Sequence, residues 1–367
     1  MKSVPKSCSV CKLLMMAGAV LGGFLIKPVE AQDVISRHHN HLVQESQTAC
    51  APYKGRKLTL VIPVKPGGGF DLMGRALVPF LADHSGMRVS VVNIAGSSGL
   101  LAIKSVAESS DKNPAVGLIN LGSFATQLAT GRSGAAFSDL VGLGVMSTDQ
   151  AVWVSRNAID WSNAAGAMMT VASPSSPYVR FGIPAQLLGL NMQPIFGYEG
   201  SNQAWMAMLR GEVDVVTMSD QSALRNLATG AQAKVSLTLT DRPLSPFSGV
   251  PHLAGPGGLL DAKTKGMNHS ERERLMSLGS LVVMLAEQSR TLVTSANLRP
   301  AMLTCLQRAT EAALFDPSLT EVAHRQKFDL NSQTAVDAQA KIGRVRQALQ
   351  THQDYLRGVA AAWKESK

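Results

Sequence analysis

The sequence predicts an α/β protein of two lobes, each a mostly parallel sheet flanked by helices, with a ligand cleft between the lobes. Short β-branched runs alternate with helical patterns, which is typical of parallel sheets covered on both faces. The alternation occurs in two successive blocks, and 367 residues are enough for two such units. A cleft between two α/β units is a common place for a small ligand.

The N-terminus has the three parts of a secretory signal peptide. Lysines precede an uncharged apolar stretch from Leu13 to Ile26, and the small residues Val29 and Ala31 suit cleavage before Gln32. The stretch of 14 residues is too short to cross a hydrocarbon layer of about 30 Å. We therefore expect residues 1–31 to be removed and the protein to be periplasmic.

Residues 32–56 lack a periodic apolar pattern, and we interpret them as a flexible leader. The run from His38 to His41 offers imidazoles that bind transition metals, but no acid or thiol stands beside it in the sequence, which favours a solvated polar segment. Cys50 and Cys305 are the cysteines beyond the signal peptide. Export allows them to pair, and two independent thiols are the alternative.

The first block begins at a β-branched run, 58–63, which leads into a glycine loop and a helix that Asp71 can cap. Further strands and helices follow from residue 89 onward, and the pattern predicts a first lobe of residues 57–155 plus 281–367. The second lobe is predicted as residues 156–280. The predicted strands lie at 58–63, 89–93, 116–121, 141–146, 151–154, 169–172, 193–197, 213–218, 235–240 and 280–285.

Three small loops are candidates for ligand binding. In the loop from Pro66 to Asp71, three glycines let the backbone approach a ligand, and the helix start that follows favours an anion. The alternative is a tight turn without a ligand. The loops Gly96–Gly99 and Gly200-Ser201 also follow predicted strands, and ligands in open α/β sheets bind at the carboxyl ends of strands.

Other function classes have little support in the sequence. The net charge is +9, or +6 after removal of residues 1–31, but only 5% of residues are aromatic and no basic block exceeds two residues, which argues against nucleic-acid binding. No GxSxG or HExxH motif occurs, and the histidines beyond residue 41 are scattered. We therefore expect no catalytic residues, no metal and no cofactor.

Several motifs in order resemble the tripartite tricarboxylate transporter receptors, also called Bug-type periplasmic solute-binding proteins. The strand 58–63 with the loop 66–72 is similar to the family's strand and Pro-Gly-Gly-Gly-x-Asp turn. Tyr198 to Ser201 stands where the family has Tyr-Lys-Gly-Ser, and Leu209 to Asp214 looks like its Leu-x-Gly-x-Val-Asp. Phe315 to Pro317 matches a late helix break. The resemblance covers roughly residues 57–357.

The resemblance implies a type II periplasmic-binding-protein fold that closes over a small carboxylate. Two departures bear on the ligand: Glu199 replaces the family's basic residue, and Arg180 follows a proline-rich loop. Arg180 is able to pair with a carboxylate, and a solvated helix residue is the alternative. The candidate ligand-binding residues are Gly68, Gly69, Phe70, Asp71, Ser123, Arg180, Gly200, Ser201 and Asp220.

The resulting hypothesis is an exported, non-enzymatic receptor. It captures a small carboxylate and delivers it to the integral membrane subunits of a tripartite transporter. A periplasmic partner of a membrane sensor kinase is one alternative, and an enzyme on the same fold is another. We expect the protein to be a monomer.

Overall fold

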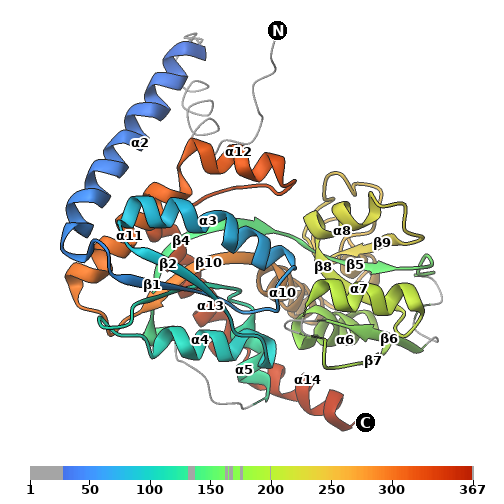
Figure 1. Ribbon diagram of the computed structural model, residues 1–367. Coiled ribbons are helices and arrows are strands. Elements are labelled where there is room, and N and C mark those ends of the chain that lie inside the picture. Colours follow the sequence, from blue (N-terminus) through green and yellow to red (C-terminus); the bar gives the residue numbers. More distant parts are fainter. Residues whose placement is uncertain are drawn as a thin grey trace, which may run out of the picture.

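The computed structural model describes residues 28–130, 137–161, 164, 168–173, 177–198 and 200–365. Two five-stranded sheets, each covered by helices, form two lobes side by side (Figure 1). Residues 1–27 of the predicted signal peptide lie outside the described residues. Within the described part of the chain, no helix carries an apolar span of the length a bilayer crossing requires.

The first sheet has the strand order β2-β1-β3-β10-β4. Strand β10 is antiparallel to both of its neighbours, so the other four strands share one direction. All residues of the central strand β3 are buried, as expected for a strand covered on both faces. The strands are β1 (Lys57–Ile62), β2 (Arg88–Asn93), β3 (Ala115–Ile119), β4 (Leu140–Asp149) and β10 (Gln288–Ser295).

Helices cover both faces of this sheet. Leu58 and Leu60 of β1 pack with Leu77 in a core formed with α3, α11 and α12, whereas Val61 belongs to the core on the other face. The first group is α3 (Gly69–Ser85), α11 (Pro300–Leu314) and α12 (Pro317–Arg325). The second is α4 (Leu100–Ala107), α5 (Ser123–Thr130) and α13 (Ala335–Thr351).

The second sheet repeats the same topology, with the order β7-β6-β8-β5-β9 and β5 as its one antiparallel strand. Its strands are β5 (Ala151–Ser155), β6 (Met168–Ala172), β7 (Asn191–Pro194), β8 (Val215–Ser219) and β9 (Lys234–Thr238). Its helices are α6 (Ile183–Leu188), α7 (Ser201–Arg210), α8 (Asp220–Leu227), α9 (Leu259–Lys263) and α10 (His269–Ala286). The predicted two-lobed α/β fold with mostly parallel sheets is therefore confirmed.

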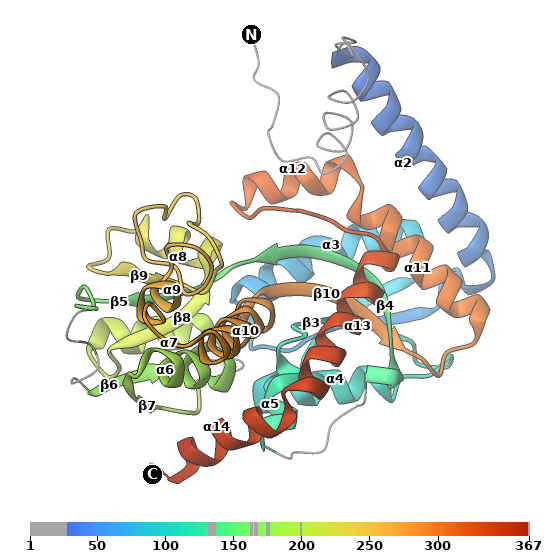
Figure 2. The ribbon, with the colours of Figure 1, turned by 180° about the vertical axis from the view of Figure 1, so that it is seen from behind.

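The chain crosses between the sheets at Gln150, between β4 and β5, and at Glu287, between α10 and β10. These crossings lie within a few residues of the predicted lobe boundaries, which stay a prediction. The C-terminal helix α14 (Gln353–Glu365) packs on α5 of the first lobe and on α6 of the second, and Figure 2 shows it running along the lower edge of both.

The strand predicted at 280–285 is wrong, because these residues form the end of α10 and the strand begins at Gln288. Leu281, Val282, Leu285 and Ala286 of this apolar run are buried in the core, and Val283 and Met284 pack against it. A short, continuous apolar run fits a buried helix as well as a buried strand, so its hydrophobicity alone does not distinguish them.

The flexible leader predicted at 32–56 is also wrong, because residues 28–50 form α2 (Pro28–Cys50), followed by a short turn and β1. The helix packs against α11 and α3. Leu42, Ser46 and Cys50 lie four residues apart on its buried face, a stripe too narrow to stand out in a polar segment. A disulfide joins Cys50 to Cys305 of α11, which settles the two alternatives left open for these cysteines.

Candidate functional site

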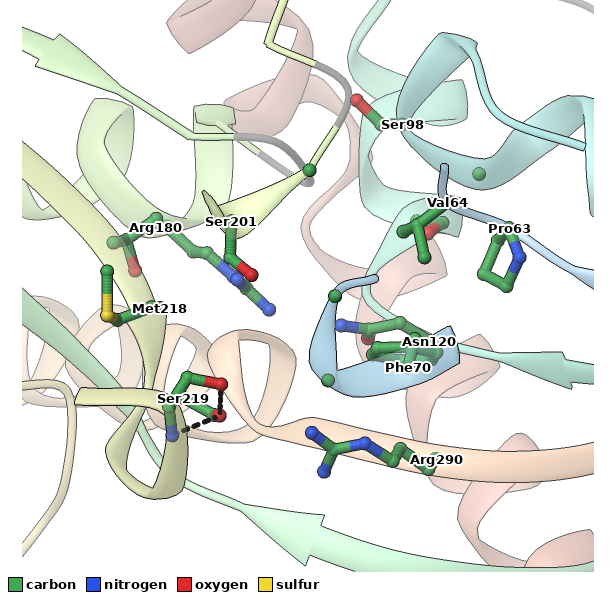
Figure 3. A pocket seen from close by; sticks show the side chains of 17 residues that line it. Pro63, Val64, Phe70, Ser98, Asn120, Arg180, Ser201, Met218, Ser219 and Arg290 are labelled. Atoms are coloured by element: carbon green, nitrogen blue, oxygen red, sulfur yellow. Dashed lines mark hydrogen bonds between the residues drawn. The ribbon is translucent and has the colours of Figure 1, made fainter. Parts of the chain in front are cut away.

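A pocket of about 60 Å³ lies between the lobes. Residues at the carboxyl ends of three strands line it: Val64 after β1, Asn120 after β3 and Ser219 at the end of β8. This is the edge at which open α/β sheets bind ligands. Figure 3 shows side chains from both lobes directed into the same space.

The first lobe contributes the start of α3. Gly68, Gly69 and Phe70 line the pocket, and no side chain caps the N-terminus of the helix. Free backbone N–H groups and the positive end of the helix dipole therefore face the pocket, which favours an anion.

Asp71 lies behind this loop and does not line the pocket. Its carboxylate accepts hydrogen bonds from the backbone N–H of Gly67 at 2.9 Å, from Asn93 Nδ2 at 2.8 Å and from Arg75 Nε at 3.0 Å. Burial alone would raise the pKa of Asp71, but these hydrogen bonds outweigh it and the pKa lies below its usual range. Asp71 therefore holds the glycine loop in shape.

Four more helix starts line the same pocket. Ser98 and Gly99 precede α4, Ser123 opens α5, Gly200 and Ser201 open α7, and Ser219 caps α8 by accepting a hydrogen bond from the Ser222 N–H at 3.2 Å. Ser98 has a φ of 56°, which is unfavourable for a residue other than glycine and is concentrated at functional sites. Together the helix starts make the pocket electropositive.

Arg180 enters the pocket from the second lobe, on a π-helical turn (Tyr178–Gly182) that precedes α6. Such turns are rare and frequently occur at functional sites. Its side chain is 1% exposed, which excludes the alternative interpretation of Arg180 as a solvated helix residue. Burial, and to a lesser extent the charge of Arg290, lowers the pKa of Arg180 to about 9, so the guanidinium remains charged at neutral pH.

Arg290, on β10, is a second buried cation in the pocket and was missed from the sequence. Its Nη1 donates to Ser147 Oγ at 2.9 Å and pairs with Asp149, and its guanidinium carbon lies 5.0 Å from the centroid of the Phe70 ring. Its Nε has no hydrogen-bond partner among the described residues. The available signal was a charged residue directly before the mostly β-branched run Thr291–Thr294, because burying an arginine is costly without a role.

Asp220 does not line the pocket but lies behind Ser219. Its backbone N–H donates to the carbonyl oxygen of Gln150 at 2.9 Å, at the point where the chain crosses between sheets. Burial, then the charge of Asp149, raises the pKa of Asp220 to about 7. This residue therefore belongs to the crossing between the lobes.

The structure brings seven of the nine predicted site residues to the pocket: Gly68, Gly69, Phe70, Ser123, Arg180, Gly200 and Ser201. Asp71 and Asp220 support it from behind. Glu199, which replaces the family's basic residue, lies outside the described residues. No acidic residue is among the described residues that line the pocket, so the lining suits an anion.

The two lobes touch around the pocket. Asn202 Nδ2 donates to the carbonyl oxygen of Gly67 at 3.1 Å, and Gln221 Nε2 donates to Asp329 Oδ2 at 2.9 Å. A Cβ at Gly69 would lie 3.3 Å from Arg225 Nη2, so the absence of a side chain lets the loop approach α8. The described arrangement is therefore a closed one.

No protein-family profile matches the sequence, and the comparison with curated proteins found no match. Solved structures are similar over most of the chain. A TctC solute-binding protein from Polaromonas is 18% identical, with a TM-score of 0.55, over 84% of this chain and 99% of that one. MatC from Rhodopseudomonas palustris with bound malate is 16% identical, with a TM-score of 0.61, over 83% and 99%.

The periplasmic binding protein BugD is 15% identical, with a TM-score of 0.61, over 84% of this chain and 98% of that one. Identities this low establish the fold rather than the ligand. The resemblance predicted from the sequence motifs is confirmed at that level. The chain has the two-lobed fold of the TctC- and Bug-type solute-binding proteins.

Proposed function

We propose that the protein is an exported receptor that captures a small carboxylate and delivers it to the membrane subunits of a tripartite tricarboxylate-type transporter. The observation that carries this proposal is the meeting of two buried guanidinium groups, Arg180 and Arg290, in a pocket without a lining acid. The malate bound to the structurally similar MatC supports the class of ligand.

The two arginines favour a ligand with two carboxylate groups. Arg180 comes from the second lobe and Arg290 from the first, so one ligand is able to pair with both when the lobes are closed. Paired hydrogen bonds between guanidinium and carboxylate are among the strongest in proteins, and they strengthen where water is excluded. The apolar side chains Val64, Phe70 and Met218 suit a short carbon chain between the two groups.

Capture takes place by closure of the lobes about the two crossings, at Gln150 and Glu287. Such hinge motions run on the microsecond to millisecond timescale. No histidine or cysteine lines the pocket among the described residues, so a nucleophile with a histidine base has no place there, which supports binding over catalysis.

Thermal unfolding of the purified protein with a panel of mono-, di- and tricarboxylates tests the proposal. A dicarboxylate at about 100 times its dissociation constant should stabilise the protein by about 2.7 kcal/mol. Arg180→Gln should abolish the shift, whereas Arg210→Gln should retain it, because Arg210 lies exposed beside Glu212 in the same lobe. The absence of a shift with every carboxylate would reject the proposal.

A deletion strain separates delivery from signalling. The proposal expects loss of carboxylate uptake when the transporter genes are expressed from an independent promoter. Unchanged uptake with altered transcription of the transporter genes would instead support a partner of a sensor kinase.

A further inference from the structure

Two histidines and an aspartate from three separate elements meet on the first lobe. His39 lies on α2, His84 in the last turn of α3, and Asp316 immediately before α12. His84 Nε2 lies 3.0 Å from Asp316 Oδ2, and His39 Nε2 lies 3.8 Å from the same oxygen. One donor atom from each residue lies within 4.8 Å of the other two. None of the three lines the pocket between the lobes.

These separations are close to those of a zinc site. Zinc binds histidine nitrogen and carboxylate oxygen at about 2.0–2.2 Å in a tetrahedron, which places neighbouring donor atoms about 3.3–3.6 Å apart. The two distances to Asp316 Oδ2 lie on either side of that range, so small rotations of the side chains complete the geometry. A water molecule would supply the fourth position.

Orientation and access also suit a cation. The Nδ1 atom of His39 is buried without a hydrogen-bond partner among the described residues, so no such bond holds the ring in its present orientation. The three side chains are 10–16% exposed, which leaves a path from solvent.

We propose that His39, His84 and Asp316 bind a zinc ion that fastens α2 to α3 and α12. His39 is partly buried and lies on the same side of α2 as the buried residues Leu42, Ser46 and Cys50. The disulfide at Cys50 holds the end of the helix, and His39 lies eleven residues upstream, about 16 Å along the axis. The ion and the disulfide thus anchor this side of α2 at two points.

Calorimetric titration of Zn²⁺ into the purified protein, stripped with a chelator, tests the proposal. We expect one equivalent to bind, and Co²⁺ to give the visible absorption of a tetrahedral site. His39→Gln should weaken binding at least tenfold. Asp316→Asn should do the same while it preserves the start of α12, because asparagine caps helices as well as aspartate and the Oδ1 bond to Ser318 N is retained.

The matched control is His41→Gln. His41 lies two residues from His39, but its side chain is 67% exposed and faces Glu45 on the same helix. This variant should bind zinc as the unaltered protein does and should keep its Tm in chelator. Absence of stoichiometric binding, or equal loss in His41→Gln and His39→Gln, would overturn the proposal. Because no carboxylate ligand is needed, its failure is separate from that of the proposed receptor function.

Discussion

Asn202 of α7 donates a hydrogen bond from Nδ2 to the carbonyl oxygen of Gly67, 3.1 Å away, and so joins the second lobe to the loop that opens α3. Gly67 has a φ of 94°, a left-handed conformation that glycine adopts without strain. The bond forms only when the lobes are together. It therefore stabilises the closed form, and with it the bound state of any ligand between the lobes.

Replacing Asn202 by alanine should weaken the proposed carboxylate binding about fivefold, mainly through faster dissociation. The reason is the loss of one hydrogen bond across the lobes, about 1 kcal/mol, from the closed form alone. Stopped-flow dissociation measures the effect. Met206→Ala on the same helix, whose side chain is 48% exposed, should leave the rate unchanged. An unchanged rate in Asn202→Ala would show that this bond does not hold the lobes together.

Gly69→Ala should weaken ligand binding tenfold or more with little change in folding stability. The new Cβ would lie 3.3 Å from Arg225 Nη2, 3.4 Å from Ser222 Oγ and 3.5 Å from Arg290 Nη2, and would separate the glycine loop from α8. Calorimetric binding and urea unfolding measure the two effects. The control is Gly343→Ala in α13, where a Cβ meets no atom within 4 Å. Equal affinities of the two variants would contradict the explanation.

Folding stability should fall as pH rises from about 4 to about 7 through the titration of Asp220. The pKa of Asp220 is about 7 in the folded protein, whereas its ordinary value is 3.8. Between pH 4 and pH 7 the folded state therefore holds a proton on Asp220 that the unfolded chain has lost. Raising the pH through this range ionises the buried acid and destabilises the folded state. Asp149 opposes its ionisation, whereas Arg290 favours it.

Asp220→Asn mimics the neutral acid and still accepts the bond from the Gln221 N–H. We expect its stability to match the unaltered protein near pH 4 and to exceed it at pH 8 by on the order of 4 kcal/mol. Urea unfolding across this range measures the difference. Asp83→Asn, at an exposed position of α3, should keep the original pH dependence. If the stability of Asp220→Asn changed with pH in the same way as that of the unaltered protein, Asp220 would be ruled out as the source of the pH dependence.

Reducing the Cys50–Cys305 disulfide should lower the free energy of unfolding by about 2–5 kcal/mol, because the bond closes a loop across 255 positions of sequence. Guanidinium unfolding with and without dithiothreitol measures the loss. The double variant Cys50→Ser, Cys305→Ser should be equally unstable in both conditions. If reductant left the free energy of unfolding unchanged, the disulfide would make no contribution to stability in solution.

Local patterns predicted much of the fold. The strand 58–63 corresponds to β1, and the glycine loop leads into α3, as expected. The predicted cap is wrong, because Gly68 is the N-cap and Asp71 lies inside the first turn of α3. These features depend on neighbouring residues, since strand alternation, glycine freedom and helix starts are properties of short segments. Two predictions were wrong because the local pattern was ambiguous. The apolar run 280–285 belongs to the end of α10 and not to a strand. The polar segment predicted as a leader belongs mostly to α2.

The composition of the site was predictable in part. Arg180 was a candidate from its place behind a proline-rich loop, and the loops at Gly68 and Gly200 were found from their glycines. Arg290 was missed because the residues around it do not indicate that β10 lies between β3 and β4 in the first sheet. Its role depends on sheet order, which spacing along the chain does not encode.

By itself the sequence determined the α/β class, the repetition in two lobes and the glycine loops that favour an anion. Only the tertiary structure decided which distant side chains meet. It places Arg290 in the same pocket as Arg180, Cys305 against Cys50, and Asp316 against His39 and His84. The physical reason is that backbone conformation is set over a few residues, whereas these contacts depend on how whole helices and sheets pack.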